Sequence, residues 1–178
     1  MVIDPHTHIV PSGFLKDVRN KVFGETVTVE NADGKEWLVT RSNVLGKQRE
    51  LRNILTPMYY EVDLRLEDMK RMEVSRQILS VSPSLTFYSL DKSITHELAQ
   101  SMNDALIQIS KDYPSKFSCM ATVPLQDPEL ATLELERAVK NGHLGVQIAS
   151  NVAGKNLDDP ALDVFWQKAQ ELGIPIFI

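Results

Sequence analysis

The chain has 178 residues, of which 43% are hydrophobic, so its length suggests one domain with a buried core. A net charge of −5 excludes the basic surface expected of a nucleic-acid-binding protein and gives no attraction to an anionic membrane. One cysteine excludes an internal disulfide, and the sequence has neither a membrane-spanning apolar run nor a signal segment. We therefore expect a cytoplasmic protein whose partner is a small molecule.

The first expected strand, near residues 2–6, runs directly into a His-x-His pair formed by His6 and His8. Side chains alternate along a strand, so Asp4, His6 and His8 should project to one side. Imidazole is the commonest metal ligand, and a catalytic zinc commonly has three protein ligands and an open position. A bare His-x-His is more often only a polar strand end. The apolar lead-in, the supporting carboxylate of Asp4 and the loop that begins at Pro11 favour a metal site.

A hairpin is expected in the loop that leaves this strand. Two β-branched runs, 26–29 and 37–40, flank Asp33-Gly34, and this arrangement is a strong hairpin signal. The hairpin should form an insertion at about 24–41. A cationic stretch follows, and on charge alone it is best interpreted as a solvated loop; its members are Arg41, Lys47, Arg49 and Arg52.

Beyond residue 60 the apolar pattern alternates between helical and strand-like periods. Helices are expected at 60–72, at 93–113, from Asp127-Pro128 to Asn141-Gly142, and from Asp159-Pro160 to Gly173, and strands at 74–81, 117–123, 144–149 and 174–178. We expect Cys119 to be a buried structural thiol. His96 should be solvated and His143 should have a local turn or surface role, so neither is expected to bind metal.

This alternation indicates right-handed βαβ units and a parallel sheet. A doubly wound open sheet could use five strands, but no glycine-rich phosphate loop follows the first one. A (β/α)8 TIM barrel needs about 250 residues and eight strands. The expected fold is therefore α/β, with residues 1–178 forming about the first five βα units of a single TIM-barrel domain. The chain stops within an apolar strand, so we expect a fragment or a truncated product.

Several motifs are spread along the whole chain, and each alone is weak. They are Ile3 through Pro11, Glu67-Asp68-Met69 with Ile78 through Val81, Phe117 with Ala121 through Gln126, Pro128 through Glu136, Gly145 through Ile148, Asn156-Leu157-Asp158 and Ile176 through Ile178. In this order and spacing they resemble the amidohydrolase-related decarboxylases. The resemblance implies a metal-dependent TIM barrel in which His6 and His8 are the first two metal ligands. It also implies a third histidine directly after Ile178, with a catalytic histidine and an aspartate ligand on later strands.

The implied activity is non-oxidative decarboxylation of a small unsaturated or aromatic carboxylic acid. In this family an arginine after the hairpin region binds the substrate carboxylate; Arg52 is the better match and Arg49 is the alternative. Zinc is the expected ion, and manganese, iron and cobalt remain open. No catalytic residue is assigned within these 178 residues.

Two other functions remain open. The same barrel could support metal-assisted hydrolysis or hydration, because one fold hosts many chemistries. A truncated product could instead be a non-catalytic metal-binding or interaction protein. A homodimer is compatible with the sequence, and the 178 residues alone are expected to bind metal weakly and to be inactive.

Overall fold

The computed structural model describes residues 1–44 and 46–178, and its centre is a set of parallel strands. These strands are β1 (Ile3–His8), β5 (Arg76–Ser80), β6 (Phe117–Cys119), β7 (Val146–Gln147) and β10 (Ile176–Phe177). β1 pairs with β5, β5 with β6, and β7 with β10. A parallel bridge from Ala121 to Val146 connects the exit of β6 to β7. The spatial order of the strands is therefore their order along the chain, as repeated βαβ units require.

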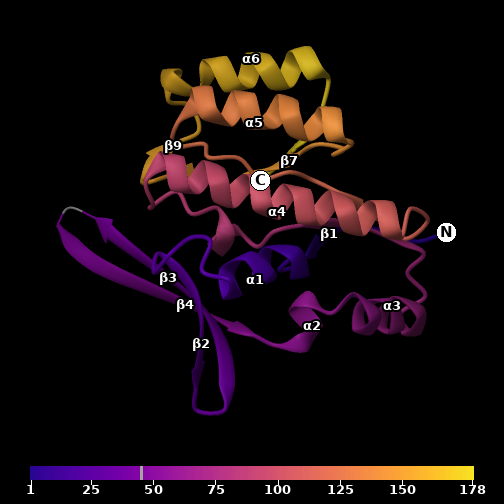
Figure 1. Cartoon of the computed structure of the whole chain (residues 1–178). Coiled ribbons are helices and arrows are strands. Elements are labelled where there is room, and N and C mark those ends of the chain that lie inside the picture. The colour runs from indigo at the N-terminus through magenta and orange to yellow at the C-terminus, as the bar shows by residue number, and fades with distance from the viewer. Residues whose placement is uncertain (45) are drawn as a thin grey trace.

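Helices follow these strands and pack beside one another. They are α1 (Ser12–Arg19), α2 (Pro57–Tyr60), α3 (Val62–Arg71), α4 (Lys92–Asp112), α5 (Pro128–Asn141) and α6 (Asp163–Leu172), with short 3₁₀ turns η1 (Pro83–Leu85) and η2 (Pro160–Leu162). α4 contacts α1 on one side and α5 on the other, and α5 contacts α6 (Figure 1). The predicted start and end of α5 are confirmed. Asp127 accepts a hydrogen bond from the Leu130 N–H, and Gly142 ends the helix at φ 112°.

A separate antiparallel sheet contains β2 (Val27–Ala32), β3 (Lys35–Val44) and β4 (Lys47–Leu55), with β3 in the middle. Asp33 and Gly34 form the β2–β3 turn with positive φ values of 51° and 70°. The interpretation of the cationic stretch as a solvated loop is wrong, because residues 47–55 form the third strand. Burial of β4 increases toward its C-terminal end: residues 47–52 are exposed, Asn53 and Ile54 are half-buried, and Leu55 lies in the core. A second small antiparallel pair, β8 (Asn151–Val152) with β9 (Lys155–Asn156), lies beyond β7.

The parallel strands curve around a common interior. β1 and β10 are the first and last strands in the spatial order, yet the rings of His6 and Phe177 meet with their centroids 4.7 Å apart. Such a contact requires the inner faces of the two outer strands to turn toward each other, as they do across a barrel. β7 and β10 also approach closely at Gly145, where an added Cβ would lie 2.5 Å from the Pro175 carbonyl oxygen.

The last four parallel strands are shorter than predicted, and β6 shows the physical reason. Beyond Cys119 the backbone bonds partly to a helix side chain instead of a neighbouring strand. The Thr122 N–H donates to Asn103 Oδ1 at 2.9 Å, and Asn103 Nδ2 donates to the Thr122 carbonyl oxygen at 2.9 Å. Asn103 also donates to the buried carboxylate of Glu134 at 2.6 Å, which Arg137 binds through two nitrogens at 2.8 Å each. This network joins α4, α5 and the exit of β6.

The sequence predicts the environments of three side chains outside this network. Cys119 is buried, as expected, and burial raises the pKa of its thiol to about 11. His143 has the expected local role, with Nδ1 3.0 Å from the Ala138 carbonyl oxygen, but it is 4% exposed, so the surface position is wrong. His96 is half-buried instead of solvated. Within the described residues, no helix is long and apolar enough to cross a membrane.

Replacing Glu134 tests the importance of the buried network. Glu134→Ala should lower the free energy of unfolding by about 1–3 kcal/mol, because the buried Asn103 amide loses one of its two acceptors and Arg137 keeps only its exposed partner Asp104. Glu136→Ala, at an exposed position of the same helix, should cost less than about 0.5 kcal/mol. Urea denaturation measures both changes. Equal effects of the two substitutions would show that the network does not hold these elements together.

Candidate metal centre

His6 and His8 lie at the C-terminal end of β1 and turn their rings toward one another. Their Nε2 atoms are 3.1 Å apart, and the ring planes are nearly perpendicular, at 89°. His6 is exposed and His8 is half-buried. Because parallel strands end at a common edge, the loops that leave β5 and β7 lie on the same side of the sheet as these imidazoles.

The register of β1 against β5 sets this arrangement. Thr7 points away from the imidazoles, and its hydroxyl donates to the Ile78 carbonyl oxygen at 3.1 Å. The regular pairing of β1 with β5 is interrupted between Asp4 and Thr7. Pro5 has no N–H to donate there, and the His6 N–H donates to Asp4 Oδ1 at 3.2 Å. Asp4 therefore supports the backbone of His6.

His8 is held from two directions. Its Nδ1 lies 3.3 Å from the Ser80 hydroxyl, and its carbonyl oxygen accepts a hydrogen bond of 2.6 Å from the Arg65 guanidinium. Burial lowers the pKa of His8, and the neighbouring His6 lowers it further. Both effects favour the neutral form of the imidazole, which is the form that binds metals. The sequence did not identify Ser80 or Arg65, because only the fold brings β5 and α3 beside β1.

The spacing of the two imidazoles fits a shared metal ion. Two nitrogens that each lie about 2.1 Å from one ion, at angles of about 90–109°, are themselves about 3.0–3.4 Å apart. The observed separation of 3.1 Å falls within this range. No group of three or more histidine, cysteine, aspartate or glutamate side chains with metal-site geometry occurs among residues 1–44 and 46–178. The described chain thus brings together two imidazoles that could bind one ion.

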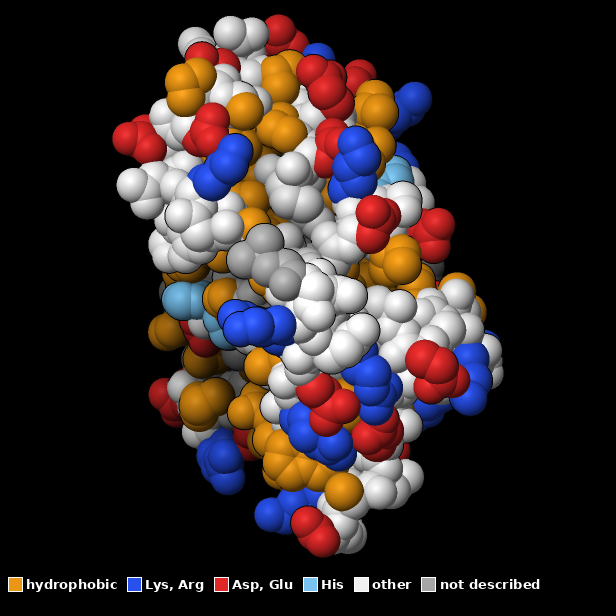
Figure 2. All heavy atoms as spheres, turned by 90° about the vertical axis from the view of Figure 1, so that its left-hand side faces the viewer, with side chains coloured by type: hydrophobic (Ala, Val, Ile, Leu, Met, Phe, Trp, Pro, Cys, Tyr) orange, Lys and Arg blue, Asp and Glu red, His pale blue; other side chains and the backbone are white. Residues whose placement is uncertain are grey.

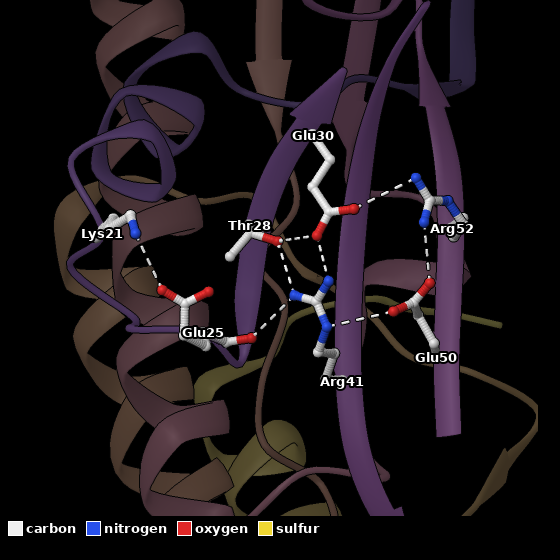
Figure 3. Close-up of polar contacts among 7 residues, drawn as sticks. All are labelled: Lys21, Glu25, Thr28, Glu30, Arg41, Glu50 and Arg52. Atoms are coloured by element: carbon white, nitrogen blue, oxygen red, sulfur yellow. Dashed lines mark hydrogen bonds and ion pairs between the residues drawn. The ribbon is translucent and has the colours of Figure 1, made fainter. Parts of the chain in front are cut away.

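Arg52 belongs to a ring of charges on the antiparallel sheet. Its guanidinium lies 3.0 Å from Glu50 and 3.4 Å from Glu30, and Arg41 pairs with the same two carboxylates (Figure 3). Hydrogen bonding to Arg41 lowers the pKa of Glu30. Arg52 also lies over the Trp37 ring, 5.7 Å from its centroid. Both acidic partners of Arg52 therefore come from the sheet itself.

Arg49 lies elsewhere, in the wall of a cavity of about 870 Å³ between the β3–β4 strands and the loops that follow β5 and β7. Figure 2 views the molecule from the side of the β3 and β4 tips and shows both signs of charge interspersed on its lower part. A smaller pocket of about 250 Å³ is lined by His8 together with β4 residues Asn53 and Ile54. Ser84 lines both spaces, so they adjoin at the same loop.

Known proteins resemble this chain in sequence and in fold. A curated relative, 2-amino-3-carboxymuconate-6-semialdehyde decarboxylase from Dictyostelium discoideum, is 30% identical over 99% of this chain and 48% of its own length. A crystal structure of 5-carboxyvanillate decarboxylase from Novosphingobium aromaticivorans with bound manganese is 31% identical. The two structures match with a TM-score of 0.61, over 65% of the present chain and 33% of the decarboxylase chain. The present chain spans about half the length of the curated relatives it matches.

The fold likeness extends over nearly the whole chain. 5-carboxyvanillate decarboxylase from Sphingomonas paucimobilis has a TM-score of 0.72 over 99% of this chain and 51% of that one, at 20% identity, which shows a shared fold of the TIM-barrel type. The sequence model of the family described as "Amidohydrolase" matches residues 3–178. The resemblance inferred from the order of the motifs is confirmed, and the chain belongs to the Amidohydrolase family.

Proposed function

We propose that the whole protein is a metal-dependent carboxy-lyase that removes CO₂ from a small unsaturated or aromatic carboxylic acid. The observation that carries the proposal is the 3.1 Å approach of His6 Nε2 to His8 Nε2 at the C-terminal end of β1. It occurs in a chain whose relatives are decarboxylases and whose structural relatives include a manganese-bound one. A hydrolase or hydratase of the same family would use the same ion on a different substrate.

We further propose that residues 1–178 form the first five βα units of a (β/α)8 barrel, with the antiparallel strands as an insertion after β1. The strand order and the contact between His6 and Phe177 support this proposal. In such a barrel, the remaining metal ligands would come from strands that follow β10, beginning with a histidine directly after Ile178. Assembly as a homodimer stays a prediction.

Each side chain of the proposed site has a defined task. His6 and His8 hold a divalent ion, while Ser80 and Arg65 fix the orientation of His8. The bound ion would supply Lewis acidity to orient and polarise the substrate. Asp4 fixes the backbone at His6. The manganese of a structural relative supports a divalent ion; zinc, the ion expected from the sequence, is the alternative that metal analysis would distinguish.

For the substrate carboxylate, the geometry favours Arg49 over Arg52. Arg52 completes a closed ring of ion pairs with Glu30, Glu50 and Arg41. If Arg52 left this ring to bind a substrate, the two glutamates would keep only Arg41 as a cationic partner. Arg49 lines the large cavity on the side where the β5 and β7 loops emerge. Its planar guanidinium can bind a carboxylate through two parallel hydrogen bonds. We therefore propose Arg49 as the carboxylate-binding residue.

Removal of one imidazole tests the metal site. His6→Ala in the protein expressed from its whole gene should lower bound metal from about one ion per chain to less than about a tenth. CO₂ release should fall by more than about 100-fold, because loss of a direct ligand exceeds the effect of losing a supporting residue. Elemental analysis and CO₂ detection measure these changes. His96→Ala on α4 is the control and should retain both properties.

Retention of full metal content and CO₂ release by His6→Ala would contradict the proposed centre. The hydrolase or hydratase alternative would instead be indicated if His6→Ala lost its metal while the unaltered protein consumed substrate without releasing CO₂.

The two arginines make a matched pair of substitutions. Arg49→Ala should raise KM by about 10- to 100-fold, since a charge-assisted hydrogen bond contributes about 1.5–3 kcal/mol. Arg52→Ala should leave KM within about twofold and lower the free energy of unfolding by less than about 1 kcal/mol, because its ion pairs are partly exposed. Steady-state kinetics and urea denaturation measure these effects. The reverse pattern would assign carboxylate binding to Arg52.

A further inference from the structure

The free edge of β4 offers backbone hydrogen bonds to a further strand. β4 lies at one edge of the antiparallel sheet, and within the described part of the chain its one strand neighbour is β3. Figure 3 shows Glu50 and Arg52 on this outermost strand. α1 packs against β2 at the opposite edge of the sheet, whereas residues 47–52 of β4 are exposed. An exposed edge strand is a template for pairing with another chain.

The pairing inside the sheet shows which residues direct their backbone groups to this edge. Successive residues of a strand direct their N–H and C=O groups to opposite sides. On β3, the Arg41 N–H donates to the Thr26 carbonyl oxygen at 2.8 Å, so the backbone of Arg41 faces β2. Thr40 beside it therefore faces β4, where it pairs with Leu51. The even-numbered residues of β4, on either side of Leu51, consequently direct their N–H and C=O groups outward.

The side chains along this edge complement a second copy of the same edge. We consider two β4 strands paired antiparallel about a two-fold axis at Leu51. Glu50 then lies opposite Arg52 of the second copy, and Arg52 lies opposite Glu50 of the second copy. Both side chains are available for such contacts, because Glu50 is 41% exposed and Arg52 is 35% exposed. Opposite charges directly across two strands stabilise the pairing.

Neighbouring registers lack this complementarity. A shift of two residues is the smallest that keeps the outward-directed backbone groups paired. Such a shift moves the axis to Glu50 or to Arg52 and places two like charges directly opposite each other, which is destabilising. The axis at Leu51 instead covers a leucine that is 49% exposed with its own copy. Charges on an edge strand discourage pairing with unrelated strands, so here they favour one partner in one register.

We propose that two copies of this protein associate through β4, so that their antiparallel sheets form one continuous sheet with Leu51 at the two-fold axis. The charge ring of each copy then continues into the other, because Glu50 and Arg52 each gain a partner of opposite charge. The inference does not depend on the metal centre or on the proposed decarboxylase function.

Cysteine substitutions along β4 test the register directly. In the non-hydrogen-bonded pair at the axis, the two Cα atoms of residue 51 would lie about 4.5 Å apart, which a disulfide can span. Leu51→Cys in the protein expressed from its whole gene should therefore form a covalent dimer on mild oxidation, as measured by non-reducing gel electrophoresis. Glu50→Cys and Arg52→Cys are the matched controls and should cross-link about 10-fold less, because neither position would lie opposite itself. The native Cys119 is buried and should not contribute.

Sedimentation of charge variants gives an independent measurement. Leu51→Lys should raise the Kd of the dimer about 10-fold or more, because an apolar contact is lost and two ammonium groups are placed opposite each other. Leu133→Lys, at a leucine of α5 that is 60% exposed, is the control and should leave the Kd within about twofold. Both variants should fold, since both positions are exposed.

Three results would overturn the inference. The unaltered protein could remain monomeric at every concentration sedimented. A dimer could persist in Leu51→Lys or cross-link best at position 50 or 52, which would show another surface or another register. A Leu51→Cys thiol that neither cross-links nor reacts with a thiol reagent would show that another part of the whole protein covers this edge.

Discussion

The parallel pairing of β1 with β5 is the constraint on which the candidate centre depends. The pairing places Thr7 opposite Leu79, where the Thr7 hydroxyl donates to the Ile78 carbonyl oxygen, and it brings Ser80 beside His8, so the two imidazoles emerge on the opposite face from Thr7. The irregularity between Asp4 and Thr7 shifts the register of β1 by one residue, because Asp4 pairs with Gln77 and Thr7 pairs with Leu79. On its far side the hydrogen bonds of Thr7 and Ser80 across the strands fix the register, and a further shift of one residue there would turn the side chains to the other face.

The antiparallel sheet is separate from the parallel strands, but it forms a wall of the proposed site. The two faces of β4 have different environments. Arg52 joins the charge ring on one face, whereas Asn53 and Arg49 line the spaces that adjoin His8 and the β5 loop. The ring pairs two positive with two negative side chains on a partly exposed surface. The burial of Leu38 and Leu55 anchors the sheet to the core. The same strand can therefore be anchored to the protein and contact a ligand.

Much of the fold follows from local sequence patterns. The Asp127-Pro128 start and Gly142 end of α5 are predictable because a cap and a left-handed residue act within a few positions. β4 was missed because a strand rich in charge resembles a loop until its partners, Glu30 on β2 and Trp37 on β3, are known.

The same distinction applies to the candidate centre. The imidazole pair is visible in the sequence because its two members are two residues apart on one strand. The supporting contacts of Arg65 and Ser80 join positions more than 50 residues apart, so only the fold reveals them. The choice between Arg49 and Arg52 likewise depends on which face of β4 each occupies, and the charge pattern alone does not determine that.

The central claim is that His6 and His8 bind one ion together. Anomalous diffraction from a crystal of the whole protein containing Mn²⁺ tests this claim most directly, because it locates the ion without reference to activity. A single strong peak is expected about 2.1 Å from Nε2 of both His6 and His8. A peak bound to neither imidazole, or two rings turned apart with no ion between them, would contradict it.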